Sequence, residues 1–297
     1  NKDFIKLCLN SNLSSEITLQ PIKRFDLDAA IIFSDILLVP HVLGQNVEFI
    51  KNKGPILSKF ITDIFFKNNF RDFEKKMSPV YEAIKKTRKN LDKKKSLISF
   101  VGAPWTLLTY MLDNNNKQGT KNIFYDKKEL SLIIDSLVEF LCLHIKNQYK
   151  SGSDIIQIFD SWAGLLSGKD LRDFCFKPNH KMVNFCKKNK IPVICFPKGI
   201  KDEYLNFNNE VKPNAINIDY DVDPVWVKNN LKNVAFQGGM NPKILLKPEK
   251  EIFTEAKRYL DIFKDVPYIF NLGHGLVPET NPDKLNKLIQ FVRQYKC

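Results

Sequence analysis

Seven short apolar runs, rich in β-branched and aromatic residues, each end in a cluster of small, polar or acidic residues. The runs are residues 29–33, 96–101, 154–159, 192–196, 214–218, 233–237 and 267–271. Continuous apolar runs of this length are typical of strands buried on both faces, as in parallel sheets. In barrels of alternating strands and helices, the chemistry gathers where the carboxyl ends of the strands meet. The pattern therefore predicts a parallel sheet with one functional rim.

Helical patterns separate these runs, and the clearest is Lys127–Lys150, where apolar residues recur every three or four positions. Further segments that indicate mainly helix are 9–24, 56–92, 169–190, 224–232, 243–264 and 281–296. The alternation predicts the α/β class and a distorted (β/α)8 TIM barrel, with only short crossover helices on either side of run 214–218. Because such a barrel has eight strands, we expect the first strand and its loop to be absent from this chain.

Length and composition favour one domain over residues 1–297, because 297 residues with 43% hydrophobic content can bury one large core. No stretch approaches the roughly 20 apolar residues needed to span a bilayer, so no membrane partner is expected. The N-terminus does not read as a leader peptide. The Asn- and Gly-containing patch Asn114–Gly119 predicts a mobile surface loop.

The formal net charge of +13 favours an anionic partner. Lysines are spread along the whole sequence, however, without an arginine-rich helix or an aromatic RNA-reading motif. We therefore expect no nucleic-acid partner, and attribute part of the charge to attraction of an acidic small-molecule substrate.

The sequence offers no pattern for a metal or an organic cofactor. Its six cysteines contain no C-x-x-C pair, which argues against a zinc site or a disulfide framework and favours a reducing compartment. The acidic run Asp219–Asp223 lacks the glycine and the glutamate of a calcium loop. The Gly238–Gly239 pair belongs to no phosphate-binding fingerprint.

Two residues at strand ends are candidates for chemistry. Asp35 lies among apolar neighbours, where a carboxylate is costly unless donors or a cationic ligand pair with it; a cap or structural hydrogen bond is an equal alternative. His274, flanked by Gly273 and Gly275, can approach a ligand closely, although a histidine held only by its loop is also possible.

Two further residues have weaker local signals. Ser161 has no G-x-S-x-G elbow and is interpreted as a hydroxyl donor or a cap rather than a nucleophile. Tyr110 follows Trp105 by about one helical turn, a position that suits the core as well as a site.

Five phrases in order resemble the uroporphyrinogen decarboxylase family of haem biosynthesis, over about residues 3 to 295. They are LDAAIIFSDILLVPHVLG, FVGAPWTLLTYML, IIQIFDSWAGLLS, FQGGMNP and IFNLGHGLVPETNPDKL. The resemblance implies a homodimer that pairs its active-site clefts and a reaction without metal or organic cofactor. It also implies that uroporphyrinogen III is the substrate, and that its four acetate side chains become methyl groups to give coproporphyrinogen III and carbon dioxide.

Carried over by this resemblance, Asp35 matches the acid that faces the pyrrole N–H groups and is the catalytic candidate. Tyr110, Ser161 and His274 match substrate-binding positions. Phe100 and Phe159 match apolar walls, and Gly102 a place where a side chain would obstruct the macrocycle.

The chain departs from the family in two places. No segment matches the family's loop of the form R-Q-A-G-R, whose arginines clamp carboxylates. In FQGGMNP, Gly239 and Asn241 replace an Asn and an Asp, which predicts a looser loop.

The sequence leaves other functions open. A corrinoid-dependent methyltransferase of the same superfamily would need a zinc thiolate site of the form H-x-C, which this sequence lacks. A basic nucleic-acid-binding protein would explain the charge but not five ordered strand-end motifs. The family favours the cytoplasm, and a plastid or apicoplast would require a targeting extension upstream.

Overall fold

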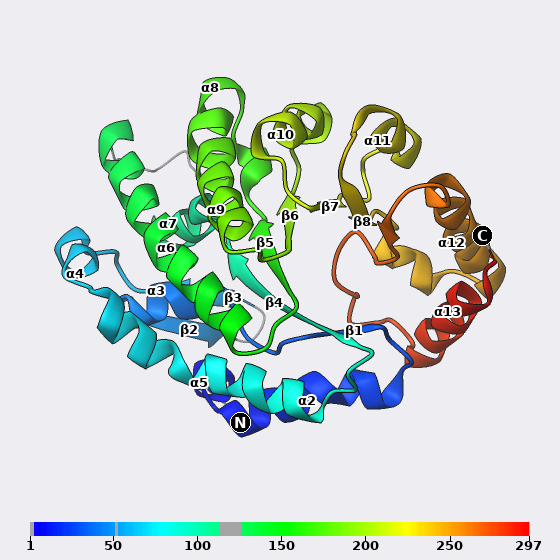
Figure 1. The fold of residues 1–297 in the computed structure, drawn as a ribbon, viewed down its shortest axis with the longest axis horizontal. Coiled ribbons are helices and arrows are strands. Elements are labelled where there is room, and N and C mark those ends of the chain that lie inside the picture. The colour runs from blue at the N-terminus through cyan, green and yellow to red at the C-terminus, as the bar shows by residue number, and fades with distance from the viewer. Residues whose placement is uncertain (1–2, 51–52, 113–125, 297) are drawn as a thin grey trace.

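The computed structural model describes residues 3–50, 53–112 and 126–296, so the patch Asn114–Gly119 lies outside the described residues. At its centre is a seven-stranded parallel sheet in the order β1-β4-β5-β6-β7-β8-β9 (Figure 1). Its strands are β1 (Ala29–Ile31), β4 (Ser96–Gly102), β5 (Ile155–Asp160), β6 (Val193–Pro197), β7 (Ala215–Ile218), β8 (Ala235–Gly238) and β9 (Tyr268–Ile269). Each predicted run forms one of these strands, so the predicted parallel sheet is confirmed.

Helices surround the sheet on its outer side and complete the α/β architecture (Figure 1). They are α1 (Phe4–Cys8), α2 (Ser11–Arg24), α3 (Leu38–Val42), α4 (Thr62–Phe66), α5 (Phe70–Asn90), α6 (Pro104–Leu112), α7 (Lys127–Lys150), α8 (Gly168–Leu171), α9 (Lys177–Lys188), α10 (Tyr204–Val211), α11 (Pro224–Asn230), α12 (Glu249–Phe263) and α13 (Pro282–Gln294). The predicted apolar stripe of α7 is buried, because its residues pack toward the sheet. The crossovers on either side of β7 use the short helices α10 and α11, as predicted.

The helical prediction for residues 56–92 is wrong at its start. Residues Gly54–Leu57 form β3, which pairs antiparallel with β2 (Val47–Ile50) in a hairpin outside the main sheet. Gly54, the first residue of β3, pairs with Ile50 at the end of β2 and has φ +83, a left-handed conformation that favours glycine. The helical part of this segment begins only at Thr62.

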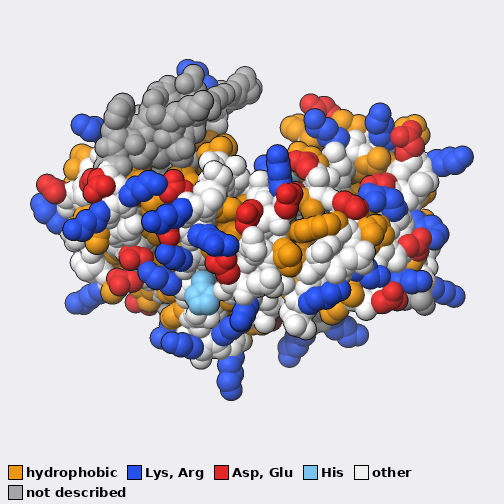
Figure 2. Space-filling view, turned by 90° about the horizontal axis from the view of Figure 1, so that it is seen from above, with side chains coloured by type: hydrophobic (Ala, Val, Ile, Leu, Met, Phe, Trp, Pro, Cys, Tyr) orange, Lys and Arg blue, Asp and Glu red, His pale blue; other side chains and the backbone are white. Residues whose placement is uncertain are grey.

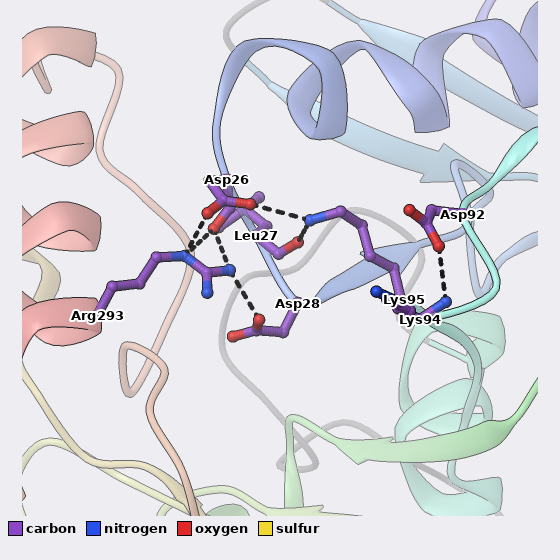
Figure 3. Close-up of polar contacts among 7 residues, drawn as sticks. All are labelled: Asp26, Leu27, Asp28, Asp92, Lys94, Lys95 and Arg293. Atoms are coloured by element: carbon purple, nitrogen blue, oxygen red, sulfur yellow. Dashed lines mark hydrogen bonds and ion pairs between the residues drawn. The ribbon is translucent and has the colours of Figure 1, made fainter.

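The sheet curls into a half-barrel whose two edges are β1 and β9. The described residues thus supply seven of the eight strands of a closed barrel. Between the two edges, Arg293 of α13 donates to the backbone carbonyl of Asp26 and, at 2.7 Å, to Oδ1 of Asp28 (Figure 3). Lys95, just before β4, binds the carboxylate of Asp26 at 3.1 Å and the carbonyl of Leu27. These contacts fasten the C-terminal helix to the segment that leads into β1.

The interior of the half-barrel holds a buried layer of amide side chains beneath the rim. Gln237 donates from Nε2 to Oδ1 of Asn217 at 2.8 Å and to Oε1 of Gln157 at 3.3 Å. Because buried amides are costly when unpaired, these bonds fix β5, β7 and β8 relative to one another. Within the described residues, no helix is both long and apolar enough to cross a bilayer.

Candidate active site

Asp35 lies in the loop that follows β1, and α2 holds this loop in place. The hydroxyl of Ser14 donates to the carbonyl of Phe33 at 2.6 Å, and the backbone N–H of Phe33 donates to Oγ1 of Thr18 at 2.8 Å. Ser14 and Thr18 are both buried. The backbone two residues before Asp35 is therefore anchored on both of its polar groups, which limits where the carboxylate can point.

The carboxylate of Asp35 is half-buried, and its Oδ1 accepts a hydrogen bond from the backbone N–H of Leu37 at 2.8 Å. Burial raises the pKa of Asp35 to about 6, with the Leu37 hydrogen bond opposing the shift. The charge of Asp35 also contributes, after burial, to the raised pKa values of Cys8 and Tyr110. The fold thus places Tyr110 in the electrostatic field of Asp35, although the two residues belong to different strand–helix units.

Tyr110 is on α6, which begins directly after β4. Its ring contacts that of Trp162 edge to face, with centroids 5.9 Å apart. The indole N–H of Trp105, on the same helix, donates to the carbonyl of Trp162 at 3.0 Å. Tyr110 is half-buried and packs against the core on one side. It therefore faces the loop after β5 with a fixed orientation.

Ser161 is held at the end of β5 by a buried network around Asp160. One carboxylate oxygen of Asp160 accepts from the Thr106 hydroxyl at 2.7 Å and the other from the Asn179 amide at 3.0 Å. The backbone N–H of Trp162 donates to the Thr106 hydroxyl at 3.2 Å. Ser161 itself is half-buried, and its hydroxyl forms no hydrogen bond with a described residue. It is thus positioned from both sides while its hydroxyl stays unpaired.

Three phenyl rings form a row along neighbouring strands. Phe100 on β4 contacts Phe159 on β5 edge to face, with ring centroids 5.6 Å apart, and Phe159 contacts Phe196 on β6 at 6.4 Å. Phe100 and Phe159 are half-buried, whereas Phe196 is buried. The row provides an apolar wall that is partly accessible near the strand ends.

Gly102 ends β4, and the space that a Cβ would need there is already filled. A methyl carbon at this position would lie 2.8 Å from Leu107 Cδ2 and 3.1 Å from Ile36 Cβ. A side chain here would displace Leu107 or Ile36, so glycine favours close packing between α6 and the loop that carries Asp35. This contact brings the Asp35 loop and the Tyr110 helix together.

His274 lies in the loop after β9 and is exposed. Its Nδ1 accepts a hydrogen bond from the backbone N–H of Gly275 at 2.8 Å, so the ring proton is on Nε2. The pKa of His274 is lowered, first by burial of the ring and then by the nearby cation of Lys198, while Asp219 opposes the shift. His274 is therefore a neutral donor at pH 7, beside the ends of β6 and β7.

The loop of FQGGMNP is held firmly despite its departures from the family. The hydroxyl of Tyr268 donates to the carbonyl of Gly238 at 2.8 Å, and that of Tyr259 to the carbonyl of Gly239 at 2.7 Å. Asn241 accepts from the backbone N–H of Lys243 at 3.0 Å. The predicted loosening is offset by these contacts, because both glycine carbonyls have tyrosine partners.

Phe196 and Lys198 were not predicted as site residues from the local sequence, and the structural role of Asp160 was not predicted either. A usable signal existed for Phe196, because Phe33, Phe100, Phe159 and Phe196 all occur near the ends of their apolar runs. For Lys198 the only indication in the sequence is its position just after the apolar run 192–196. In the part of the chain that the structure describes, no three or more His, Cys, Asp or Glu side chains gather as metal ligands would.

A family model described as uroporphyrinogen decarboxylase (URO-D) matches residues 1–295. The chain belongs to this family. It is 41% identical over 301 residues to a uroporphyrinogen decarboxylase of Rickettsia bellii, with 99% of this chain and 88% of the relative covered. It is 38% identical over 296 residues to the protein of the same name from Wolbachia pipientis wMel, with 99% and 87% covered.

Solved structures support the barrel architecture of this decarboxylase family member. A methyltransferase from Methanosarcina mazei matches with a TM-score of 0.77 and 16% identity, over 99% of this chain and 88% of that one. A B12-independent methionine synthase from Shewanella sp. W3-18-1 matches with a TM-score of 0.60 and 13% identity, over 96% and 87%. At such low identity these likenesses concern the fold alone.

Proposed function

We propose that this protein decarboxylates the four acetate side chains of uroporphyrinogen III, giving coproporphyrinogen III and carbon dioxide. The observation that carries the proposal is the membership of the uroporphyrinogen decarboxylase family over nearly the whole chain, joined to the setting of Asp35. Asp35 is a half-buried carboxylate with a raised pKa, next to Tyr110. Groups of this kind are typical of active sites.

The chemistry requires an electron sink for the carbanion that forms when an acetate loses carbon dioxide. A pyrrole protonated on a ring carbon becomes an iminium-like cation and can accept these electrons. The substrate therefore carries its own sink. The protein has to stabilise this transient cation and orient the departing carboxylate.

Asp35 fits the first of these tasks. A carboxylate about 4 Å from the cation contributes roughly 4 kcal/mol at an effective dielectric near 20. This corresponds to about a thousandfold in rate. The same carboxylate accepts hydrogen bonds from the pyrrole N–H groups and so centres the macrocycle in the site.

The remaining matched residues position the substrate. The hydroxyls of Tyr110 and Ser161 and the Nε2–H of His274 donate to substrate carboxylates. Phe100 and Phe159 contact the apolar face of the macrocycle, while Gly102 keeps the Asp35 loop close to α6.

The test is anaerobic turnover of uroporphyrinogen by the protein in its full natural length. We expect coproporphyrinogen as product, with kcat/KM falling below about pH 6 as Asp35 takes up a proton. Asp35→Asn should lower kcat about a thousandfold. The matched control is Asp202→Asn, an exposed acid after β6, which should keep full turnover. Near-normal turnover of a folded Asp35→Asn variant would contradict the assignment.

We further propose a homodimer in which the mouths of the two half-barrels face each other. Four large apolar side chains in the segments that follow β5, β7 and β9 are at least 36% exposed. They are Trp162, Leu165, Tyr220 and Leu276. Burying them in a symmetric interface would remove this apolar area from water.

The competing functions have weaker support. The likeness to a methyltransferase concerns the fold, and a zinc measurement on purified protein separates that activity from the proposed one. On the face shown in Figure 2, Lys and Arg side chains are interspersed with Asp and Glu rather than gathered into one basic patch. A gel shift at several salt concentrations tests for nucleic-acid binding.

We expect the protein to act in the cytoplasm, as the family favours.

A further inference from the structure

Lys198 is the first residue after β6 and is held rigidly at the rim. Its backbone N–H donates to the carbonyl of Asp160 at 3.1 Å, and its own carbonyl accepts from the N–H of Gly164 at 2.9 Å. These bonds connect the end of β6 to the end of β5 and to the loop that follows β5. The backbone position of Lys198 is therefore set by two neighbouring segments rather than by a mobile loop.

The side chain of Lys198 is half-buried, and its ammonium forms no hydrogen bond or ion pair with any described residue. The first two residues after each of the other six strands of the sheet contain no lysine or arginine. A partly desolvated cation without a partner costs free energy, and an anionic ligand removes that cost. Lys198 thus supplies a positive charge directly at a strand end, where the other six strands supply none.

The neighbours of Lys198 define which anion suits it. Its charge acts on His274, across the ends of β6 and β9, and on Asp219 after β7. The carboxylate of Asp219 is turned toward the backbone N–H of Gly199, at 2.6 Å, and the hydroxyl of Tyr204, at 3.0 Å. Both bonds go to Oδ2 of Asp219, and Asp219 attracts the ammonium of Lys198 without a hydrogen bond or ion pair to it among the described residues. The ammonium therefore remains available together with the Nε2–H of His274.

We propose that Lys198 binds a carboxylate side chain of the substrate jointly with His274. The ammonium supplies the charge and the imidazole supplies a directional neutral donor, a combination that suits one carboxylate group. This role rests on the proposed function, because it assumes a polycarboxylate macrocycle at the rim. It makes Lys198 a binding residue, while Asp35 acts on the reacting ring.

Kinetics and binding test this role with three variants. Lys198→Gln should raise KM for uroporphyrinogen about tenfold or more and change kcat by less than about threefold, because the contact is made before and during the reaction alike. Lys198→Arg should keep most of the affinity, since it keeps the charge. Lys243→Gln is the matched control: this exposed lysine follows β8 at the same end of the barrel, and its loss should leave KM unchanged.

Binding of uroporphyrin, the oxidised macrocycle with the same carboxylates, separates this inference from the proposed function. Its Kd, measured by fluorescence, should rise about tenfold or more in Lys198→Gln and stay unchanged in Lys243→Gln. An unchanged Kd and KM in Lys198→Gln, or no binding of uroporphyrin to the unsubstituted protein, overturns the role of Lys198. Binding that depends on Lys198 in a protein without turnover supports the role and contradicts the decarboxylase activity.

An NMR titration gives a readout that does not depend on any ligand. The cation of Lys198 lowers the pKa of His274, so Lys198→Gln should raise that pKa toward its ordinary value. The resonance is assigned by its loss in His274→Ala. A His274 pKa that is the same in Lys198→Gln and in the unsubstituted protein contradicts the pairing of the two side chains.

Discussion

If the proposed function holds, a single side chain at the rim of the half-barrel is expected to have opposite effects on activity and on stability. Asp35 illustrates this best, because a carboxylate placed to stabilise a cation is poorly solvated before the cation forms. Burial raises the pKa of Asp35 to about 6 from its usual 3.8, so the folded protein holds the proton more tightly than the unfolded chain. In the absence of substrate, the ionised form of Asp35 therefore destabilises the fold.

The pH dependence of stability follows from the upward direction of the Asp35 pKa shift. Between about pH 4 and pH 6 the folded state binds more protons at Asp35, so its contribution to stability falls as the pH rises through that window. Asp35→Asn should raise the free energy of unfolding by up to about 3 kcal/mol at pH 7 and by nothing below about pH 4. Urea unfolding at several pH values measures this. A variant that is less stable at pH 7 would contradict the burial of the charge.

In the proposed site His274 should affect binding more than chemistry, because its Nδ1 accepts from Gly275 and leaves the Nε2–H of a neutral ring as the donor for a substrate carboxylate. We expect His274→Ala to raise KM about tenfold and to change kcat by less than about threefold. The exposed His180 on α9 is the control, and His180→Ala should leave both constants unchanged. Steady-state kinetics decide the point. Complete loss of decarboxylation in His274→Ala would instead give this residue a part in the reaction itself.

At the level of elements, side chains connect the C-terminal helix α13 to the segment that leads into β1, which is one edge of the sheet. Arg293 on α13 contacts two residues that lead into β1, and Lys95 joins them to the start of β4 (Figure 3). A guanidinium suits this place because it donates to a carbonyl and to carboxylates at the same time. The C-terminal helix thereby stabilises the first strand of the sheet.

Removal of this bridge should loosen both elements that it joins. Arg293→Gln is expected to lower the free energy of unfolding by about 1 kcal/mol, since the arginine is partly exposed but bonds to backbone as well as to charge. Lys257→Gln, which breaks an exposed pair within α12, should cost only about 0.3 kcal/mol. Hydrogen exchange should also quicken in α13 and before β1. Equal changes in the free energy of unfolding in the two variants would show that Arg293 stabilises the fold no more than an ordinary surface ion pair.

At the scale of the whole molecule, the exposed apolar residues around the mouth bear on how two copies associate. Sedimentation should detect a dimer at micromolar concentration. Leu276→Glu should shift this equilibrium toward monomer, because a charge in the core of an interface is costly. Leu132→Glu is the control, since Leu132 is 56% exposed but lies on helix α7 and in none of the segments that directly follow the strands. A monomeric unsubstituted protein would contradict the proposed interface.

Local patterns in the sequence indicate where the strands occur along the chain and which residues follow each of them. Apolar runs and helical stripes are local patterns, so β4 to β9, the long helix α7 and the strand-end position of Asp35 were predictable without coordinates. The β2–β3 hairpin was not predictable, because its residues also fit a helix-rich stretch and only the pairing of the two strands distinguishes the two structures.

The spatial neighbours of each of these residues follow only from the folded structure. The raised pKa of Asp35, the packing around Gly102 and the effect of the Lys198 cation on the pKa of His274 all depend on neighbours from segments far apart in the chain. Burial and electrostatic fields are sums over spatial neighbours, and a local pattern does not contain them. The curl of the sheet brings those neighbours together and makes one rim out of separate strand ends.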